Sequence, residues 1–286
     1  MRMKKIGVIG CGLMGRGIVE VAARAGYSTV VREVAQEPLD AGLESLRASL
    51  ERQLHKERIS PSDFEDTLAR IEGTVSLEPL ADCDLVIEAI VENREVKAQL
   101  FDDLHAVVQE SALFASNTSS LTLTQLAAGS GRPDRFVGIH FFNPVPAMKL
   151  TEVIRTLVTS DDAFDRSWAF VESLGKTPIA CKDNSGFIVN RLLVPYLLDA
   201  IRAYENGIGT LEDIDTGMKL GCGHPMGPFT LLDFIGLDTI YFIADIMFDE
   251  YREARFAPPP LLKQMVQAGR LGRKSGRGFY DYGGAS

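Results

Sequence analysis

The sequence predicts an α/β fold, in which a doubly wound, mostly parallel sheet is followed by an all-α C-terminal domain. Short apolar strands alternate with amphipathic helices through the first part of the chain, a pattern typical of parallel strands joined by crossover helices. A glycine-bearing turn lies between the first strand and the first helix. After residue 183 the pattern becomes helical, with glycine and proline between the segments. We therefore expect two domains, residues 1–183 and residues 184–286.

Composition sets the broad class of protein. The chain has 286 residues, of which 45% are hydrophobic and 24% are charged, as in soluble globular proteins. Its formal net charge of −9 argues against nucleic acid as the main partner, because clustered Lys and Arg supply that affinity. No apolar run approaches the roughly 20 residues that span a bilayer, so we expect no membrane association and a cytoplasmic location. The 4 cysteines are scattered, which predicts reduced thiols and no metal site.

The first part of the chain begins with a βαβ unit. Residues 5–9 predict a strand, residues 13–25 a helix that ends at Gly26, and residues 28–33 a second strand. Two helices follow, the second of which begins at Ser60 and Pro61. The alternation then continues with strands at 84–90, 113–117, 136–141 and 177–182, an apolar stretch at 151–159, and helices at 95–109, in the 120s and near 162–174.

The second part carries four apolar-rich helical segments, at residues 186–207, 210–221, 227–251 and 259–269. These segments are apolar around much of their circumference. Such surfaces need mutual burial or a partner subunit, because exposed apolar patches of that size are unusual on monomers. We therefore expect a homodimer that forms through the C-terminal domain.

The motif Gly10-Cys11-Gly12-Leu13-Met14-Gly15 joins the first strand to the first helix. Gly10 permits a tight turn, Gly12 lets the backbone approach a pyrophosphate, and Gly15 allows close packing of helix on strand. The N-terminus of the helix, which begins with Leu13 and Met14, supplies N–H donors to the anion. Glu33 ends the second strand, 18 residues beyond Gly15, where a carboxylate can bind an adenosine ribose. This order of strand, turn, helix, strand and acid predicts a Rossmann-type, NAD-binding domain. The alternative interpretation is a glycine-rich turn followed by a solvated Glu.

A histidine and a glutamate follow further along the chain. His140 lies at the end of strand 136–141, at the edge where parallel sheets present ligand-binding residues, and Glu152 follows 12 positions later. A carboxylate bonded to one imidazole nitrogen fixes the tautomer, and the other nitrogen can then exchange a proton with a substrate oxygen. From spacing alone, however, a histidine at a strand end near a glutamate is more often structural than catalytic.

Seven segments together resemble the 3-hydroxyacyl-CoA dehydrogenase family, and particularly its bacterial 3-hydroxybutyryl-CoA dehydrogenases. They are GVIGCGLMGRGI, DLVIEAIVENREVK, FASNTSSL, GIHFFNPVPAMKLTEVI, DNSGFIVNR, DIDTGMKLGCGHPMGPFTLLDFIGLDT and GRKSGRGFYDY. The resemblance covers nearly the whole chain in the order of the family. It implies NAD-dependent, reversible oxidation of the (S)-3-hydroxyl group of a CoA thioester to a 3-keto group. It also implies a homodimer whose helical domain contributes to the substrate cleft.

The resemblance assigns roles to matching residues. His140 matches the catalytic base of the family and Glu152 its carboxylate partner. Ser119 matches the serine that hydrogen-bonds the reacting oxygen, and Asn190 matches the asparagine that supports the histidine and the substrate. Without the resemblance, Ser119 would be a helix cap and Asn190 a polar helix residue. The residues that match the cofactor site of the family are Glu92, Lys97, Asn117 and Lys274.

Two residues of the long helix after the second strand match the CoA site. Ser45 matches a CoA contact, and Arg52 replaces the lysine that is usual in the family. Their spacing of seven residues is about two helical turns, so they share one face. The alternative is a solvated amphipathic surface, which the neighbouring Glu51 and Glu57 also fit.

Arg32 and Glu33 give opposite signals about the cofactor. A carboxylate repels the 2′-phosphate of NADP, whereas a guanidinium could attract it. Side chains alternate faces along a strand, so the two residues should not face the same ribose. We expect NAD preference through Glu33, with NADP still possible because of Arg32.

Two other functions fit the same fold. They are a gulonate-type sugar-acid dehydrogenase and a non-catalytic, crystallin-like relative.

Overall fold

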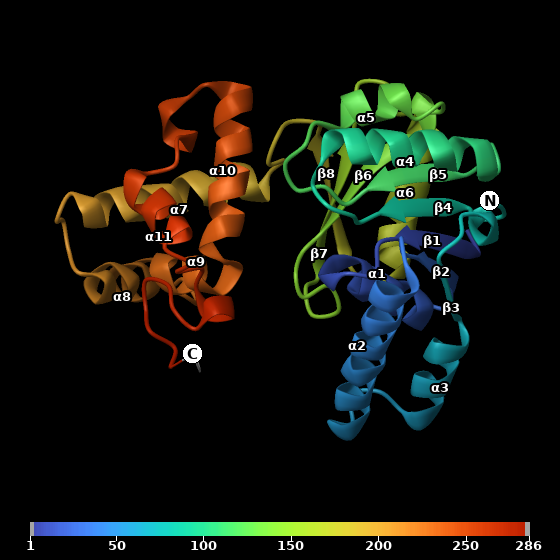
Figure 1. Cartoon of the computed structure of the whole chain (residues 1–286), viewed down its shortest axis with the longest axis horizontal. Helices are drawn as coiled ribbons and strands as arrows, with labels where there is room; N and C mark the ends of the chain where they lie inside the picture. The colour runs from blue at the N-terminus through green and yellow to red at the C-terminus, as the bar shows by residue number, and fades with distance from the viewer. Residues whose placement is uncertain (1–2, 284–286) are drawn as a thin grey trace. The chain divides into compact units, whose positions relative to one another are not determined.

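The computed structural model describes residues 3–283, and the chain divides into two compact units, Met1–Asn184 and Ser185–Ser286. The first unit is a sheet covered by helices, and the second is helical (Figure 1). The predicted fold class, a mostly parallel doubly wound sheet followed by an all-α domain, is thus confirmed.

The sheet has eight strands in the order β3-β2-β1-β4-β5-β6-β7-β8. All neighbouring strands are parallel except β6 and β7. Because β1 lies between β2 and β4, the strand order reverses there, and a crevice opens beyond the carboxyl ends of the strands. The strands are β1 (Lys5–Ile9), β2 (Ser28–Arg32), β3 (Ile71–Thr74), β4 (Leu85–Glu88), β5 (Leu113–Ser116), β6 (Phe136–Phe141), β7 (Leu150–Arg155) and β8 (Thr177–Lys182).

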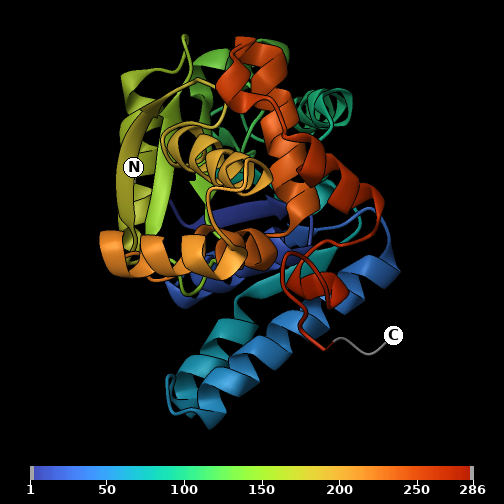
Figure 2. The ribbon, with the colours of Figure 1, turned by 90° about the vertical axis from the view of Figure 1, so that its left-hand side faces the viewer.

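Every residue of β4, β5 and β6 is buried, as expected for central strands that are covered on both faces. Several helix starts carry a polar cap: Ser60 forms a capping box with Asp63 at α3, and Asn93 caps α4. Figures 1 and 2 show α2 and α3 side by side, projecting beyond the sheet. The helices of this unit are α1 (Leu13–Arg24), α2 (Gln36–His55), α3 (Pro61–Ala69), α4 (Arg94–Val107), α5 (Leu123–Gly129) and α6 (Asp161–Ser173).

The second unit has its own apolar core, which includes Leu197, Phe229 and Met247. The buried carboxylate of Asp215 accepts hydrogen bonds from the backbone N–H groups of Phe229 and Thr230, which start α9. Its helices are α7 (Val189–Glu205), α8 (Leu211–Cys222), α9 (Pro228–Ile235), α10 (Leu237–Tyr251) and α11 (Pro260–Gln267).

Two elements differ from the prediction. The strand β3 is not predicted, because its sequence IEGT is short, half exposed and without an apolar pattern. The predicted helical segment 227–251 is two helices, since Gly236 between them has φ +107° and cannot continue a helix.

Candidate active site

The glycine turn between β1 and α1 has the geometry that its three glycines predict. Gly10 has φ +96°, and a Cβ atom there would lie 2.6 Å from the carbonyl oxygen of Ala89. A Cβ atom on Gly15 would lie 1.9 Å from the carbonyl oxygen of Gly10, so the close approach of α1 to the turn requires glycine. A Cβ atom on Gly12 would meet nothing within 4 Å. The backbone at Gly12 therefore faces open space beside the first turn of α1, where Leu13 is exposed and Met14 is half buried.

A cavity of about 810 Å³ extends from this turn along the ends of β2 and β4 to α4. Gly10, Gly12 and Glu33 lie in its wall. The Glu33 carboxylate accepts hydrogen bonds from the backbone N–H groups of Cys11, at 2.9 Å, and Val34, at 2.8 Å. A glycine turn at a helix N-terminus, an open approach at Gly12 and a fixed carboxylate fit the pyrophosphate and ribose of NAD.

Arg32 lines the same cavity as Glu33. The strand β2 ends at Arg32, so Glu33 lies just beyond the regular strand. The buried Nε atom of Arg32 has no hydrogen-bond partner among residues 3–283.

A buried ion network lies at the carboxyl ends of β4 and β5. The ammonium of Lys97 on α4 contacts a carboxylate oxygen of Glu88 at 2.6 Å and one of Glu92 at 2.9 Å. The Lys97 side chain is only 1% exposed, so this predicted cofactor residue is held between two carboxylates. Glu88 also accepts hydrogen bonds from the Ser116 hydroxyl, at 2.6 Å, and from the backbone N–H of Ile90.

Glu92 connects this network to the loop that follows β5. One of its carboxylate oxygens accepts hydrogen bonds from the hydroxyls of Thr118 and Ser120 and from the backbone N–H of Ser119, at 3.3 Å. Burial raises the pKa of Glu92, but the charge of Lys97 and the hydrogen bonds outweigh it, so the pKa lies below its usual value. Glu92 is therefore a stable anion that fixes the backbone of Ser119.

His140 and Glu152 lie directly opposite each other on the antiparallel strands β6 and β7. The Nδ1 atom of His140 lies 2.6 Å from a carboxylate oxygen of Glu152, and both side chains are buried. Next to this pair, the side-chain oxygen of Asn117 accepts a hydrogen bond from the backbone N–H of Phe141. Asn117 thus ties the end of β5 to the strand that carries His140. The structure brings together the predicted residues Asn117, Ser119, His140 and Glu152, and Glu92 with them, at one edge of the sheet.

The other predicted residues lie elsewhere. Ser45 is half buried and Arg52 is exposed, both on α2. Two lie in the second unit: Asn190 is half buried in the first turn of α7, and the ammonium of Lys274 contacts the carboxylate of Asp238 at 2.6 Å.

Sequence reasoning missed Glu88, Ser116 and Thr118. The available signal for Glu88 was an acidic residue that ends the apolar strand sequence LVIE, where a buried charge needs a partner.

Within residues 3–283, no three His, Cys, Asp or Glu side chains are grouped so that they could hold a metal ion. Among the same residues, no helix combines the length and hydropathy of a membrane span.

Comparison with known proteins agrees with this geometry. Residues 5–184 match the NAD-binding domain of 3-hydroxyacyl-CoA dehydrogenase, and residues 186–282 match its C-terminal domain. A 3-hydroxybutyryl-CoA dehydrogenase of Bradyrhizobium diazoefficiens is 47% identical over 283 residues, which cover 99% of this chain and 97% of the relative.

Two crystal structures are closely similar. Mycobacterium tuberculosis FadB2 has a TM-score of 0.97 at 47% identity, covering 99% of this chain and 100% of that chain. The (S)-3-hydroxybutyryl-CoA dehydrogenase of Ralstonia eutropha has a TM-score of 0.95 at 41% identity, with the same coverage. The chain belongs to the 3-hydroxyacyl-CoA dehydrogenase family.

Proposed function

We propose that this chain catalyses the reversible, NAD-dependent oxidation of (S)-3-hydroxyacyl-CoA to 3-ketoacyl-CoA, with short-chain 3-hydroxybutyryl-CoA as the substrate. The buried contact of His140 with Glu152, at the sheet edge that also carries the glycine turn, supports the proposal most strongly. The names of the similar proteins support the same substrate.

In this proposal, His140 moves the proton. Glu152 engages Nδ1, orients the ring and stabilises its charged form, so the other ring nitrogen can take the proton of the substrate hydroxyl. In the reverse direction, the imidazolium returns that proton to the oxygen of the keto group. NAD, when bound, supplies the chemistry of accepting the hydride from C3. Ser119 hydrogen-bonds the reacting oxygen, and Asn190 supports the histidine and the substrate.

We assign NAD rather than NADP as the cofactor. Gly10, Gly12 and the first turn of α1 would hold the pyrophosphate, and Glu33 would hold the adenosine ribose. The Glu33 carboxylate accepts two backbone N–H bonds that keep it in the cavity wall, where it would repel a 2′-phosphate. The remaining predicted cofactor residues, Glu92, Lys97, Asn117 and Lys274, keep that role as part of this proposal.

Three further parts of the proposal concern the whole enzyme. Ser45 and Arg52 on α2 contact the CoA nucleotide. The helical unit forms a homodimer, which its exposed apolar side chains support. The enzyme works in the cytoplasm, and the free thiols of Cys11, Cys83 and Cys222 suit a reducing compartment.

The experiment is a spectrophotometric assay of the purified chain with acetoacetyl-CoA and NADH, run beside NADPH and beside gulonate with NAD. We expect NADH oxidation with acetoacetyl-CoA and no turnover of gulonate. Preference for gulonate would support a sugar-acid dehydrogenase. Absence of turnover with both substrates, in a protein that binds NADH, would support a non-catalytic relative.

A further inference from the structure

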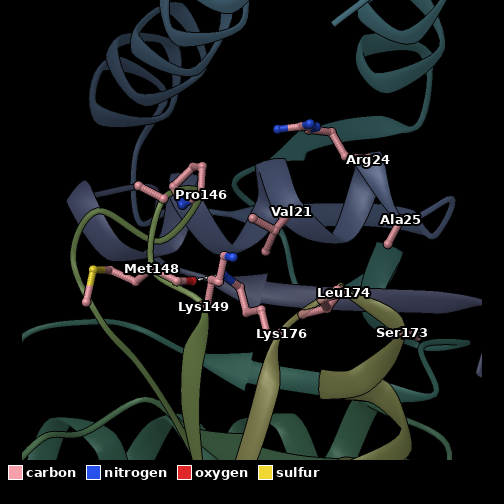
Figure 3. Close-up of a pocket in the computed structure, with 11 residues that line it drawn as sticks. Val21, Arg24, Ala25, Pro146, Met148, Lys149, Ser173, Leu174 and Lys176 are labelled. Carbon is pink, nitrogen blue, oxygen red and sulfur yellow. Dashed lines mark hydrogen bonds between the residues drawn. The ribbon is translucent and has the colours of Figure 1, made fainter. Parts of the chain in front are cut away.

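A second cavity, of about 410 Å³, lies in the first unit against the loop that joins β6 to β7, residues 142–149 (Figure 3). Its wall is formed by the last turn of α1, by this loop and by the turn between α6 and β8. Three cationic residues and no carboxylate line it. The three are Arg24, Lys149 and Lys176, of which only Lys176 is buried.

The ammonium of Lys176 is bonded to the backbone of this loop. It donates hydrogen bonds to the carbonyl oxygens of Val145, at 2.6 Å, and Met148, at 2.7 Å. Lys176 is only 8% exposed, and no carboxylate among residues 3–283 lies within 4.0 Å of its ammonium. Burial lowers the pKa of this group. A buried ammonium without a carboxylate is costly, so the two carbonyl bonds are its main compensation.

The loop also has backbone contacts: the N–H groups of Ala147 and Met148 donate to the carbonyl oxygen of Pro144, and the N–H of Thr177 donates to that of Lys149. Val145 is buried against α1, where a Cβ atom on Gly17 would lie 2.8 Å from the Cβ atom of Val145. By contrast, most of the loop is exposed, namely Asn143, Pro144 and residues 147–149. The cavity also leaves one side of the loop without packed side chains. The bonds from Lys176 add to these contacts, because they tie the carbonyl groups of Val145 and Met148 to the turn that precedes β8.

The loop and Lys176 also reach the neighbours of His140. The Lys176 ammonium lies 6.0 Å from the centre of the Phe141 ring, at the limit of a cation–π contact. The next residue, Phe142, begins the loop, and its ring centre lies 4.6 Å from that of His140. A displaced loop would therefore move the ring that packs on the imidazole.

We propose that Lys176 is a positioning residue for the proton-exchanging pair. By holding the loop 142–149 and the ring of Phe141, it fixes the imidazole of His140 against the carboxylate of Glu152. The proposal rests on the proposed function, because it concerns the same histidine. Lys176 itself touches neither substrate nor cofactor in this role.

The test compares Lys176→Met, which removes the donors, with Lys176→Arg, which keeps charged donors. Lys149→Met is the matched control, because Lys149 lines the same cavity but is exposed and makes no side-chain hydrogen bond or ion pair among the described residues. We expect Lys176→Met to lower kcat about 10- to 100-fold, since a misplacement of about 1 Å can cost that much. The dissociation constant of NADH should not change, Lys176→Arg should recover most of kcat, and Lys149→Met should match the unmodified enzyme.

A readout independent of turnover is the NMR chemical shift of the His140 ring C–H groups. In Lys176→Met these signals should move, because the position of the ring against Glu152 and Phe142 changes. An unchanged kcat and unchanged His140 ring signals, with only a lower Tm, would overturn the proposal. If the unmodified chain does not turn over acetoacetyl-CoA but the ring signals still move, the proposed function fails and the positioning role stands. Should Lys176→Met not fold, Lys176→Gln, which keeps neutral N–H donors, is measured against the same criteria.

Discussion

Four carboxylates at the carboxyl edge of the sheet, those of Glu33, Glu88, Glu92 and Glu152, each contact a donor from another residue. Their roles differ because their donors differ. Glu33 is held by backbone N–H groups, Glu88 and Glu92 share the ammonium of Lys97, and Glu152 contacts an imidazole. Only the last of these donors is an imidazole, the kind of side chain that proteins use most often for acid–base catalysis.

The first prediction at this scale concerns the proton transfer. His140→Gln and Glu152→Gln should each lower kcat by about 10²- to 10⁴-fold, because general acid–base catalysis contributes that much. Affinity for NADH, measured by fluorescence titration, should remain, since neither side chain lies in the wall of the cavity next to the glycine turn. Weaker NADH binding with normal turnover would contradict the assignment.

The second prediction concerns cofactor preference. Glu33→Ala should narrow or reverse the preference for NADH over NADPH, because it removes the repulsion of a 2′-phosphate and leaves Arg32 in the same cavity. The measurement is kcat/KM with each cofactor. Equal use of NADPH by the unmodified enzyme would show that Arg32 governs the site.

The third prediction is a pH dependence. The pKa of Glu92 is lower in the folded chain than its usual value of 4.5, so its charge stabilises the fold above that pH. This stabilisation is lost as the pH falls through the lowered pKa. Glu92→Gln should therefore cost about 1–3 kcal/mol at pH 7, the usual cost of an unmade charged hydrogen bond.

Urea unfolding at pH 7, 5 and 3 checks the Glu92 prediction. The difference in unfolding free energy between the two proteins should shrink toward acid pH. A difference that stays constant with pH would mean that packing, and not the charge of Glu92, causes it.

The sequence predicts three of these four glutamates, because Glu33 follows from motif spacing and the other two from the family resemblance. Glu88 could not be found in this way. Its role depends on the meeting of β4, α4 and β5, which places Lys97 and Ser116 on either side of it.

At the scale of elements, α2 packs closely on the glycine turn beside the cofactor site. A Cβ atom on Gly42 would lie 2.3 Å from the Sγ atom and 2.5 Å from the carbonyl oxygen of Cys11. Cys11 belongs to the turn and also donates its N–H to Glu33. The position of α2 is therefore coupled to the position of Glu33.

Gly42→Ala should consequently destabilise the fold by about 1–3 kcal/mol, the usual cost of overpacking, and weaken NADH binding. Gly217→Ala is the matched control, because Gly217 lies in α8 and a Cβ atom there would meet nothing within 4 Å. Alanine there should stabilise the fold by up to about 1 kcal/mol and leave NADH binding unchanged. Thermal unfolding and NADH titration measure both. Normal NADH affinity in Gly42→Ala would refute the coupling.

Elements with a clear apolar period are predictable from the sequence, and those set by tertiary contacts are not. The strands at residues 5–9, 136–141 and 177–182 have the predicted bounds, because their apolar runs end at polar or turn residues. The strand β3 exists because β2 offers it a parallel edge. The break at Gly236 depends on a backbone angle that the apolar sequence around it hides.

At the scale of the whole molecule, the second unit exposes large apolar side chains. Leu192 is 69% exposed, Ile208 76% and Leu220 82%. The homodimer that the sequence predicts would cover these side chains, and their exposure makes them the residues at which that prediction is tested.

We expect light scattering after size exclusion to give the mass of a dimer. Leu220→Lys should shift the equilibrium toward monomer, because it would place a charge in the proposed interface. Leu157→Lys is the control, since Leu157 is 90% exposed but lies in the first unit. If the unmodified protein has the mass of a monomer, the proposed dimer is rejected. A dimer formed by the helical unit is also rejected if only Leu157→Lys shifts the equilibrium toward monomer.

The antiparallel pairing of β6 with β7 also bears on the order of events during folding. The two strands are joined by residues 142–149 only, so His140 and Glu152 meet through a local hairpin, a structure that forms in about 1–10 μs. The crevice beside the glycine turn needs β1 beside β4, a pairing of Ile6 with Leu85 that must first close a long loop. We therefore expect His140 and Glu152 to meet early in folding, and the crevice beside the glycine turn to be completed later.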